Sequence, residues 1–381
     1  MILNSPKLGR LSLTAKPFAS GGAGEVYRAT SDSGDQYCVK ILTKPKDDVF
    51  DKLRYMVSQP PGIISRGWGK LCWPIDLVFK PRVAEPVGYV MALAFDDSLE
   101  LSNLTNLRWP GGERPELAVK VDRKSPQSLS NRLKISCNIA AAIEHIHAMG
   151  YVFVDLKPQN VLISPKGEVS VVDLDSLQIK VGPLVYRGPL GSPEYMPSES
   201  YQMDFGVGPA VEQNWDCFAL AVIIYEILLG IHPYTGALKP SAPDCPTIAD
   251  SIRFRMYVHG VNRSQFQVIP PPHDGVAKLP LEIINLFSDA FESARPAGRP
   301  TATAWVQALR PAAKQTEIPA APAAGQAPGR PIPALNRQNC WGPWGKTCPH
   351  ELRGVFKSGL PNAVARGGLS VYFCDDCLPG R

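Results

Sequence analysis

The stretch that decides the fold spans residues 151–163 and reads Tyr151-Val152-Phe153-Val154-Asp155-Leu156-Lys157-Pro158-Gln159-Asn160-Val161-Leu162-Ile163. A tight turn follows at residues 164–167, and residues 168–172 return as a strand that ends at Asp173-Leu174-Asp175. The hairpin brings an Asp, a Lys two residues on, an Asn five residues on and a second Asp together. Such an acid and amide cluster suits two divalent ions on a triphosphate and a base beside a hydroxyl group.

A helix is predicted directly before this stretch, over residues 128–149. Its apolar residues repeat with helical spacing on one face, at Leu129, Leu133, Ile139, Ile143 and Ile146. Gly150 follows and is expected to end the helix as a C-cap residue.

A glycine-rich segment near the start of the chain, residues 18–29, predicts two strands joined by a turn. Glycines allow the backbone to approach phosphate oxygens and to direct N–H groups at them, although such a hairpin is often only a turn. A second strand pattern, residues 37–42, places Lys40 among apolar neighbours. The pairing of a lone lysine with the glycine-rich loop favours a phosphate-binding role for both.

The order of these motifs resembles that of eukaryotic-like Ser/Thr protein kinases over about residues 10–310. Residues 155–160 match the catalytic loop, and residues 191–199 match the end of the activation segment. Three further residues match structural positions of the family. Asp216 would tie down the catalytic loop, and Glu199 and Arg299 would form an ion pair.

The resemblance implies Mg²⁺-dependent phosphoryl transfer from ATP to Ser or Thr hydroxyl groups of a protein. Asp155 would accept the proton of the substrate hydroxyl, and Lys157 would neutralise charge on the moving phosphoryl group. Asn160 and Asp173 would hold Mg²⁺. The remaining ATP-binding residues would be Gly21, Gly22, Gly24, Val26, Lys40, Met91 and Leu93, with Met91 beside the adenine pocket and Leu93 in the hinge.

Several residues depart from the family pattern. Phe153 and Val154 replace the usual His and Arg before the catalytic Asp, so the loop is of the non-RD type and a phosphorylated activation segment lacks its usual basic partner. The metal-binding triplet ends in Asp175 where the family has Gly. No Glu appears between Ile41 and Pro60, where the partner of Lys40 is expected, and Asp51 is the candidate acid. The alternative is that Asp51 is a solvated residue at the start of a helix.

Retention of Lys40, Asp155, Asn160 and Asp173 favours an active kinase. The alternative is a catalytically weak or inactive ATP-binding pseudokinase scaffold. Residues 55–76 give a narrower resemblance to bacterial kinases of tellurium-resistance-linked (TerY-P type) phosphorylation systems. That resemblance implies a role in stress signalling beside a partner phosphatase and a von Willebrand A-type protein.

Composition divides the chain into three parts. Residues 1–310 form the expected α+β kinase domain, with a β-rich N-lobe over about residues 1–92 and a helical C-lobe over about residues 93–310. Residues 311–339 contain 14 Pro or Ala among 29 residues and are predicted to be a linker. Residues 340–381 would form a small separate module.

The last 42 residues contain four of the nine cysteines, namely Cys340, Cys348, Cys374 and Cys377. The second pair has the C-x₂-C spacing of a zinc knuckle, and His350 is an alternative ligand. So short a segment builds little core without a staple, which favours a structural Zn²⁺ over free thiols or disulfides. A zinc-ribbon-like module is therefore expected.

Charge and hydropathy exclude other classes. Residues 1–310 carry 32 basic and 31 acidic side chains, which gives no electrostatic support to nucleic-acid binding. The longest apolar run, residues 217–231, is interrupted by Glu226 and is too short to span a membrane. The first residues lack a signal-peptide pattern, so a cytoplasmic location is expected.

Overall fold

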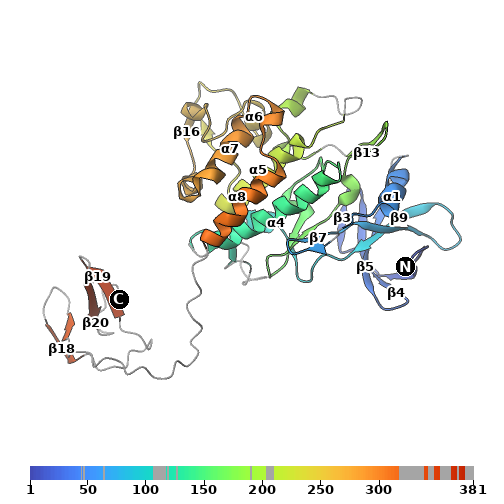
Figure 1. Ribbon diagram of the computed structural model, residues 1–381, viewed down its shortest axis with the longest axis horizontal. Helices are drawn as coiled ribbons and strands as arrows, with labels where there is room; N and C mark the ends of the chain where they lie inside the picture. Colours follow the sequence, from blue (N-terminus) through green and yellow to red (C-terminus); the bar gives the residue numbers. More distant parts are fainter. Residues whose placement is uncertain are drawn as a thin grey trace. The chain divides into compact units, whose positions relative to one another are not determined.

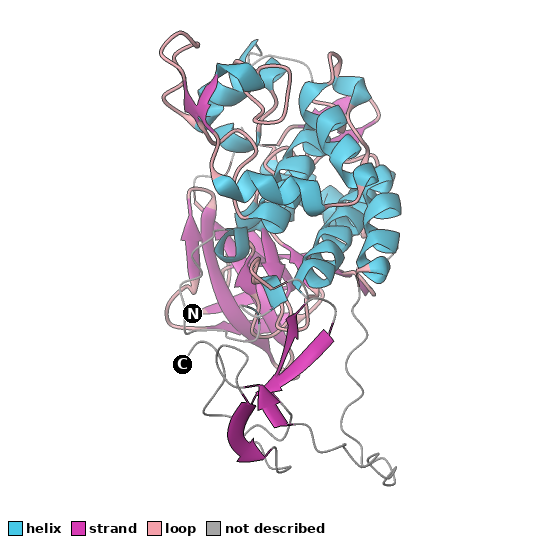
Figure 2. Cartoon of the chain, turned by 90° about the vertical axis from the view of Figure 1, so that its left-hand side faces the viewer, coloured by secondary structure: helices cyan, strands magenta, loops and turns pink. Residues whose placement is uncertain are grey.

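The computed structural model describes residues 1–43, 45, 48–62, 65–105, 117, 120–125, 128–188, 191–202 and 210–316, and four strands between residues 339 and 373. Two compact units divide the chain, Met1–Ile318 and Pro319–Arg381, and each is described by itself. The first unit has the β-rich amino-terminal lobe and the helical carboxy-terminal lobe that the sequence predicts, as Figures 1 and 2 show.

The amino-terminal lobe is built on a seven-stranded antiparallel sheet with the order β2-β1-β8-β9-β5-β4-β3. Strand β2 also pairs with β4, so six of the strands close into a ring. One helix, α1, packs against β8. The elements are β1 (Ile2–Ser5), β2 (Gly9–Leu13), β3 (Ala19–Gly21), β4 (Gly24–Ser31), β5 (Gln36–Leu42), α1 (Val49–Ser58), β8 (Pro74–Phe79) and β9 (Pro86–Ala92).

The ring closes between β1 and β8. There the buried carboxylate of Asp76 adds hydrogen bonds to the strand pairing. Asp76 accepts hydrogen bonds from the Ser5 hydroxyl at 2.6 Å and from the Lys7 amide at 2.7 Å. Charge-assisted bonds of this kind are stronger than neutral ones. Asp76 therefore anchors the first strand to the rest of the lobe.

A second, five-stranded sheet contains strands from both lobes, in the order β10-β11-β12-β7-β6. Strands β7 and β12 pair in parallel, with Gly69 opposite Val169 and Leu71 opposite Val171. Gly69 has a φ of 150°, and a side chain there would meet the Val169 carbonyl oxygen at 1.9 Å, so only glycine fits. The strands are β6 (Ser65–Arg66), β7 (Gly69–Leu71), β10 (Leu99–Glu100), β11 (Val161–Ile163) and β12 (Val169–Val171).

The carboxy-terminal lobe is mainly helical. The helix predicted over residues 128–149 is present as α4, and Gly150 follows it with a φ of 79°. Among the described residues, the helices of this lobe are α2 (Ser102–Thr105), α4 (Ser128–Ala148), α5 (Asn214–Leu229), α6 (Ile248–Arg253), α7 (Leu281–Glu292) and α8 (Ala302–Gln315). The described part of the lobe also has two short hairpins, β13 (Ile179–Val181) with β14 (Leu184–Tyr186) and β15 (Ala237–Leu238) with β16 (Phe266–Val268). Short 3₁₀ turns occupy Pro158–Asn160, Leu174–Ser176, Pro193–Tyr195, Ser198–Gln202, Arg263–Gln265, Pro271–Lys278 and Pro296–Gly298.

Helix α5 forms the centre of this lobe and explains the longest apolar run of the sequence. Every residue from Trp215 to Leu229 is buried, as expected for a helix that is apolar all round. Among the described residues, no helix combines the length and the apolar character that a bilayer crossing requires. The apolar run is therefore a core helix.

Glu226 is buried inside α5, and its carboxylate lies 3.1 Å from the Tyr195 hydroxyl, which donates to it. Burial raises the pKa of Glu226 from 4.5 to about 8. Between these pH values the folded protein holds a proton that the unfolded chain has released, so stability falls as pH rises through this window.

We expect Glu226→Gln to remove that loss, because the amide stays neutral and still accepts from Tyr195. The free energy of unfolding of the variant should exceed that of the wild type by about 2 kcal/mol or more at pH 7.5, with the difference shrinking towards pH 5. Chemical denaturation across this pH range measures it. A variant no more stable than the wild type at pH 7.5 would contradict the assignment.

Helix α8 corrects one predicted boundary. The segment predicted as a linker begins at Pro311, but α8 continues through Pro311 to Gln315. Ala312 and Ala313 are buried against α4, and the Ser130 hydroxyl donates to the Ala313 carbonyl at 2.9 Å. The packing of these small residues outweighs the single backbone hydrogen bond that a proline removes.

The residues described in the second unit form two antiparallel hairpins, β17 (Asn339–Trp341) with β18 (Thr347–Glu351) and β19 (Asn362–Arg366) with β20 (Leu369–Phe373). Cys340 lies in β17, and Cys348 and His350 lie in β18. Cys374 and Cys377 lie outside the described residues. The described part of the chain contains no group of three or more His, Cys, Asp or Glu residues that could hold a metal ion.

Candidate active site

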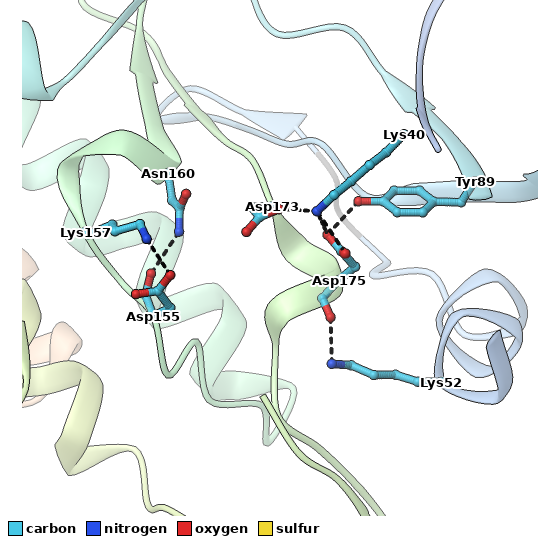
Figure 3. Close-up of polar contacts among 8 residues, drawn as sticks. All are labelled: Lys40, Lys52, Tyr89, Asp155, Lys157, Asn160, Asp173 and Asp175. Carbon is cyan, nitrogen blue, oxygen red and sulfur yellow. Dashed lines mark hydrogen bonds and ion pairs between the residues drawn. The ribbon is translucent and has the colours of Figure 1, made fainter. Parts of the chain in front are cut away.

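The predicted catalytic loop forms a compact polar cluster (Figure 3). The Lys157 ammonium donates to the Asp155 carboxylate at 2.6 Å, and the Asn160 side-chain amide donates to the Asp155 carbonyl at 2.8 Å. A 3₁₀ turn, Pro158–Asn160, folds Asn160 back towards Asp155. The three residues are therefore held together by one short segment, as their spacing predicts.

The loop is tied to α5 by Asp216, which is fully buried. Its two carboxylate oxygens accept from the backbone amides of Phe153 at 2.6 Å and Val154 at 3.0 Å, and one oxygen also contacts His147 at 2.9 Å. Asp216 thus takes the predicted position beneath the catalytic loop.

Val154 adopts a left-handed backbone conformation, with a φ of 65°. This conformation is costly for a β-branched residue and persists only where the surroundings impose it. The Asp216 bond to its amide and a 3.1 Å bond from the Trp215 indole to its carbonyl hold it. Gly188 and Gly191 lie against Val154, because a side chain on either would collide with it. Gly188 thus lies against the Val154 side chain and Gly191 against its carbonyl oxygen, at the residue that replaces the family's Arg.

Ser192 is a site residue that was not predicted. Its hydroxyl and its amide both donate to the same oxygen of Asp155 at 2.9 Å, and the Lys157 ammonium donates to the hydroxyl at 3.1 Å. Ser192 joins the activation segment to the catalytic loop. Its position beside Gly191 in the activation-segment motif was the available signal.

The predicted Mg²⁺ ligands offer the oxygen donors that this ion prefers. The Asn160 amide group donates to the Asp155 carbonyl, which leaves its side-chain oxygen for another partner. One oxygen of Asp173 pairs with Lys40, and the side chain remains 34% exposed. The Val172 amide donates to the Asn160 carbonyl at 3.0 Å, so the two ligands come from adjoining strand ends. These residues fit Mg²⁺ bound to a nucleotide.

The glycine-rich segment forms a tight hairpin in which Gly21 pairs with Gly24. Gly21 and Gly22 are exposed with open space beside them, which suits a loop that approaches phosphates. Gly24 is different, because a side chain there would meet the Ile41 carbonyl oxygen at 2.2 Å. Gly24 is therefore required for packing against β5.

Lys40 lies opposite Val26 in β4 and opposite Tyr89 in β9. Its ammonium contacts two carboxylates, Asp173 and Asp175, and lies 2.8 and 2.9 Å from the two oxygens of Asp175. Burial alone would lower the pKa of Lys40, but the two carboxylates hold it above its ordinary value. Lys40 is thus a buried, charged side chain beside the metal-binding triplet.

The prediction that Asp51 pairs with Lys40 is wrong. Asp51 is on helix α1 as expected, but its side chain is 63% exposed and bonds to Arg54 at 2.7 Å. The helix buries Lys52, Leu53 and Met56 instead. Because consecutive helical residues are about 100° apart around the axis, Asp51 faces solvent when Lys52 faces the core.

Lys52 and Asp175 are two further residues that were not predicted for the site. The Lys52 ammonium donates to the Asp175 backbone carbonyl at 2.6 Å. Burial lowers the pKa of Lys52 to about 8. Although burial acts in the opposite direction, Lys40 and a hydrogen bond from Tyr89 hold the pKa of Asp175 below its ordinary value.

The other predicted residues lie as follows. Met91 is buried at the end of β9, opposite Cys38, and Leu93 packs at the edge of the same core. Arg299 makes a two-pronged ion pair with Glu199, at 2.5 and 2.7 Å. This pair links the end of the activation segment to the turn before α8.

Residues 110–307, about half of the chain, match the model of the protein kinase domain. The match begins after the amino-terminal lobe, so it includes the catalytic loop and the metal-binding triplet but neither Lys40 nor the glycine-rich hairpin.

Three relatives extend the comparison. Protein kinase YegI of Escherichia coli (strain K12) is 26% identical over 309 residues, 79% of this chain and 44% of that protein. Protein kinase YegI of Escherichia coli O157:H7 is 30% identical over 309 residues, 79% of this chain and 45% of that protein. Serine/threonine-protein kinase PEPKR2 of Arabidopsis thaliana is 29% identical over 127 residues, 33% of this chain and 25% of that protein. The chain spans less than half the length of the YegI kinases.

Proposed function

The chain belongs to the protein kinase family, and from this premise we propose that it transfers the ATP γ-phosphoryl group to Ser or Thr hydroxyl groups of a protein. The observation that carries the proposal is the cluster around Asp155. A carboxylate held between Lys157 and a serine hydroxyl has the partners that a base beside a substrate hydroxyl needs. Ser/Thr selectivity is supported by the similarity to the serine/threonine-protein kinase PEPKR2.

Each residue of the cluster has a defined task in this proposal. Asp155 accepts the proton of the attacking hydroxyl, and Lys157 offsets charge on the transferred group. Asn160 and Asp173 would hold Mg²⁺, which supplies charge neutralisation on the phosphates, and Lys40 would contact the α- and β-phosphates. Positioning and electrostatics carry the rate, since little covalent chemistry is required of the protein.

Because the loop is of the non-RD type, the proposed activity does not depend on the usual phosphate on the activation segment. Val154 packs against Gly188 and Gly191, and Ser192 bonds directly to Asp155. These contacts order the segment next to the loop without any phosphorylated residue.

Incubation of the purified chain with γ-labelled ATP, Mg²⁺ and a generic basic protein tests the proposal. Label on Ser or Thr of the substrate, or of the chain itself, is the expected result. Binding of ATP without transfer would establish the pseudokinase scaffold instead, and label confined to Tyr would overturn the Ser/Thr assignment. Bacterial stress signalling, and a partner phosphatase and von Willebrand A-type protein, follow from the narrower sequence resemblance alone.

For the carboxy-terminal unit, the proposal is a structural Zn²⁺ held by Cys340, Cys348, Cys374 and Cys377. It rests on the C-x₂-C spacing and on the shortage of large apolar residues in that segment. Elemental analysis of the purified full chain is expected to give about one zinc per molecule, and the Cys374→Ser and Cys377→Ser double variant should lose it. A metal-free wild-type protein would overturn the proposal.

A further inference from the structure

The acid that contacts Lys40 comes from the metal-binding triplet and not from helix α1. Asp175 presents both carboxylate oxygens to the Lys40 ammonium, at 2.8 and 2.9 Å. The side chains of Lys40 and Asp175 are only 6% and 7% exposed. Figure 3 shows the two side chains pointing at one another from β5 and from the turn after Asp173.

Tyr89 fixes the orientation of this carboxylate. It is fully buried, lies opposite Lys40 across the β5–β9 pairing, and donates its hydroxyl to Asp175 at 2.6 Å. The carboxylate thus accepts from an ammonium and a phenol at the same time. Buried charges are tolerated when they are paired and hydrogen-bonded in this way.

Helix α1 contributes a cation to the same residue. Lys52 donates to the Asp175 backbone carbonyl at 2.6 Å, from the buried face of the helix. Two lysines and two aspartates, Asp173 and Asp175, therefore share this region and balance in formal charge. Helix α1 thus contacts the triplet through the Lys52 side chain, which bonds to the triplet's backbone. The acid that pairs with Lys40 comes from the triplet itself.

We infer that Asp175 is the positioning residue for Lys40, and that Lys52 in turn holds Asp175 in place. The inference rests on the proposed function for its kinetic consequence but not for its geometry. Lys40 also contacts Asp173. Without Asp175, Asp173 would be the remaining carboxylate partner of Lys40. That pairing would then compete with the proposed role of Asp173 as a Mg²⁺ ligand.

The kinetic test compares Asp175→Asn with Asp51→Asn, the acid on helix α1. Asparagine keeps the size of the side chain and removes the charge. We expect Asp175→Asn to lower kcat about tenfold or more and to raise the Mg²⁺ concentration needed for half-maximal activity, with the affinity for adenosine unchanged. Adenosine lacks phosphates, so a general loss of structure would weaken its binding as well. Normal kcat and Mg²⁺ dependence in Asp175→Asn, or the loss appearing in Asp51→Asn instead, would overturn the inference.

A second measurement needs neither nucleotide nor activity. Unfolding midpoints are compared for the wild type, Lys40→Met, Asp175→Asn and the double variant. Paired groups give non-additive changes, so the double variant should differ from the sum of the single changes by about 2 °C or more. The cycle of Lys40→Met with Asp51→Asn is the matched control and should be additive. Additive changes in both cycles would refute the pairing, whether or not the chain transfers phosphate.

Discussion

Asp155→Asn is expected to lower kcat by about 10²- to 10⁴-fold while the affinity for ATP stays close to that of the wild type. The amide has the size of the carboxylate, and its one oxygen can still accept from Ser192, whereas its NH₂ group cannot accept from Lys157. The bond from Asn160 to the carbonyl of residue 155 is unaffected, so the loop should keep its shape. It cannot take the proton of an attacking hydroxyl at neutral pH. Steady-state kinetics with a protein substrate and titration with ATP measure the two quantities separately.

The matched control is Asp289→Asn, because Asp289 is an exposed acid on α7. It changes the net charge equally and should leave both quantities unaltered. A kcat of Asp155→Asn within twofold of the wild type would exclude Asp155 as the base.

Asp216→Ala is expected to have the largest effect on stability. The change removes the acceptor of two backbone amides, Phe153 and Val154, in a fully buried place where water cannot replace it. Loss of a buried charged acceptor with its donors left unpaired costs about 3 kcal/mol or more. The strained left-handed backbone of Val154 should relax as well, and activity should fall with it.

Denaturant unfolding gives the free energy change, and hydrogen exchange at the two amides reports the local loosening. Exchange at Phe153 and Val154 should accelerate, whereas Asp289→Ala should change neither quantity. An Asp216→Ala protein within 1 kcal/mol of the wild type, with both amides still protected, would show that the tether is dispensable.

The catalytic loop was predictable because its residues lie in one continuous segment. The Asp155, Lys157 and Asn160 spacing and the hairpin to Asp173 follow from local sequence, and the structure brings them together. The partner of Lys40 depends on tertiary packing instead. Asp175 is 135 residues from Lys40, and its importance appears only when helix α1 is found to bury Lys52.

Asp51 was the wrong choice because helix α1 turns the next residue, Lys52, towards the core and leaves Asp51 exposed. The sequence contains an acid at that position, but helix orientation depends on which residues the core accepts. Similarly, the Pro and Ala content of residues 311–339 suggested a linker from its first residue. Composition does not show that Ala312 and Ala313 are buried against α4.

The parallel pairing of β7 with β12 limits how the two lobes move. Residues on either side prolong it, because the Cys72 amide donates to the Val171 carbonyl at 2.9 Å and the Val169 amide donates to Trp68 at 3.3 Å. Strand β12 leads directly to Asp173, so separation of the lobes would break a backbone ladder beside the proposed metal ligands. Strand β3, in contrast, is exposed and pairs, among the described strands, with β4 alone. Separation of β3 from β4 would therefore leave every other described strand pairing of the amino-terminal lobe intact, whereas β4 is held by β2 and β5 as well.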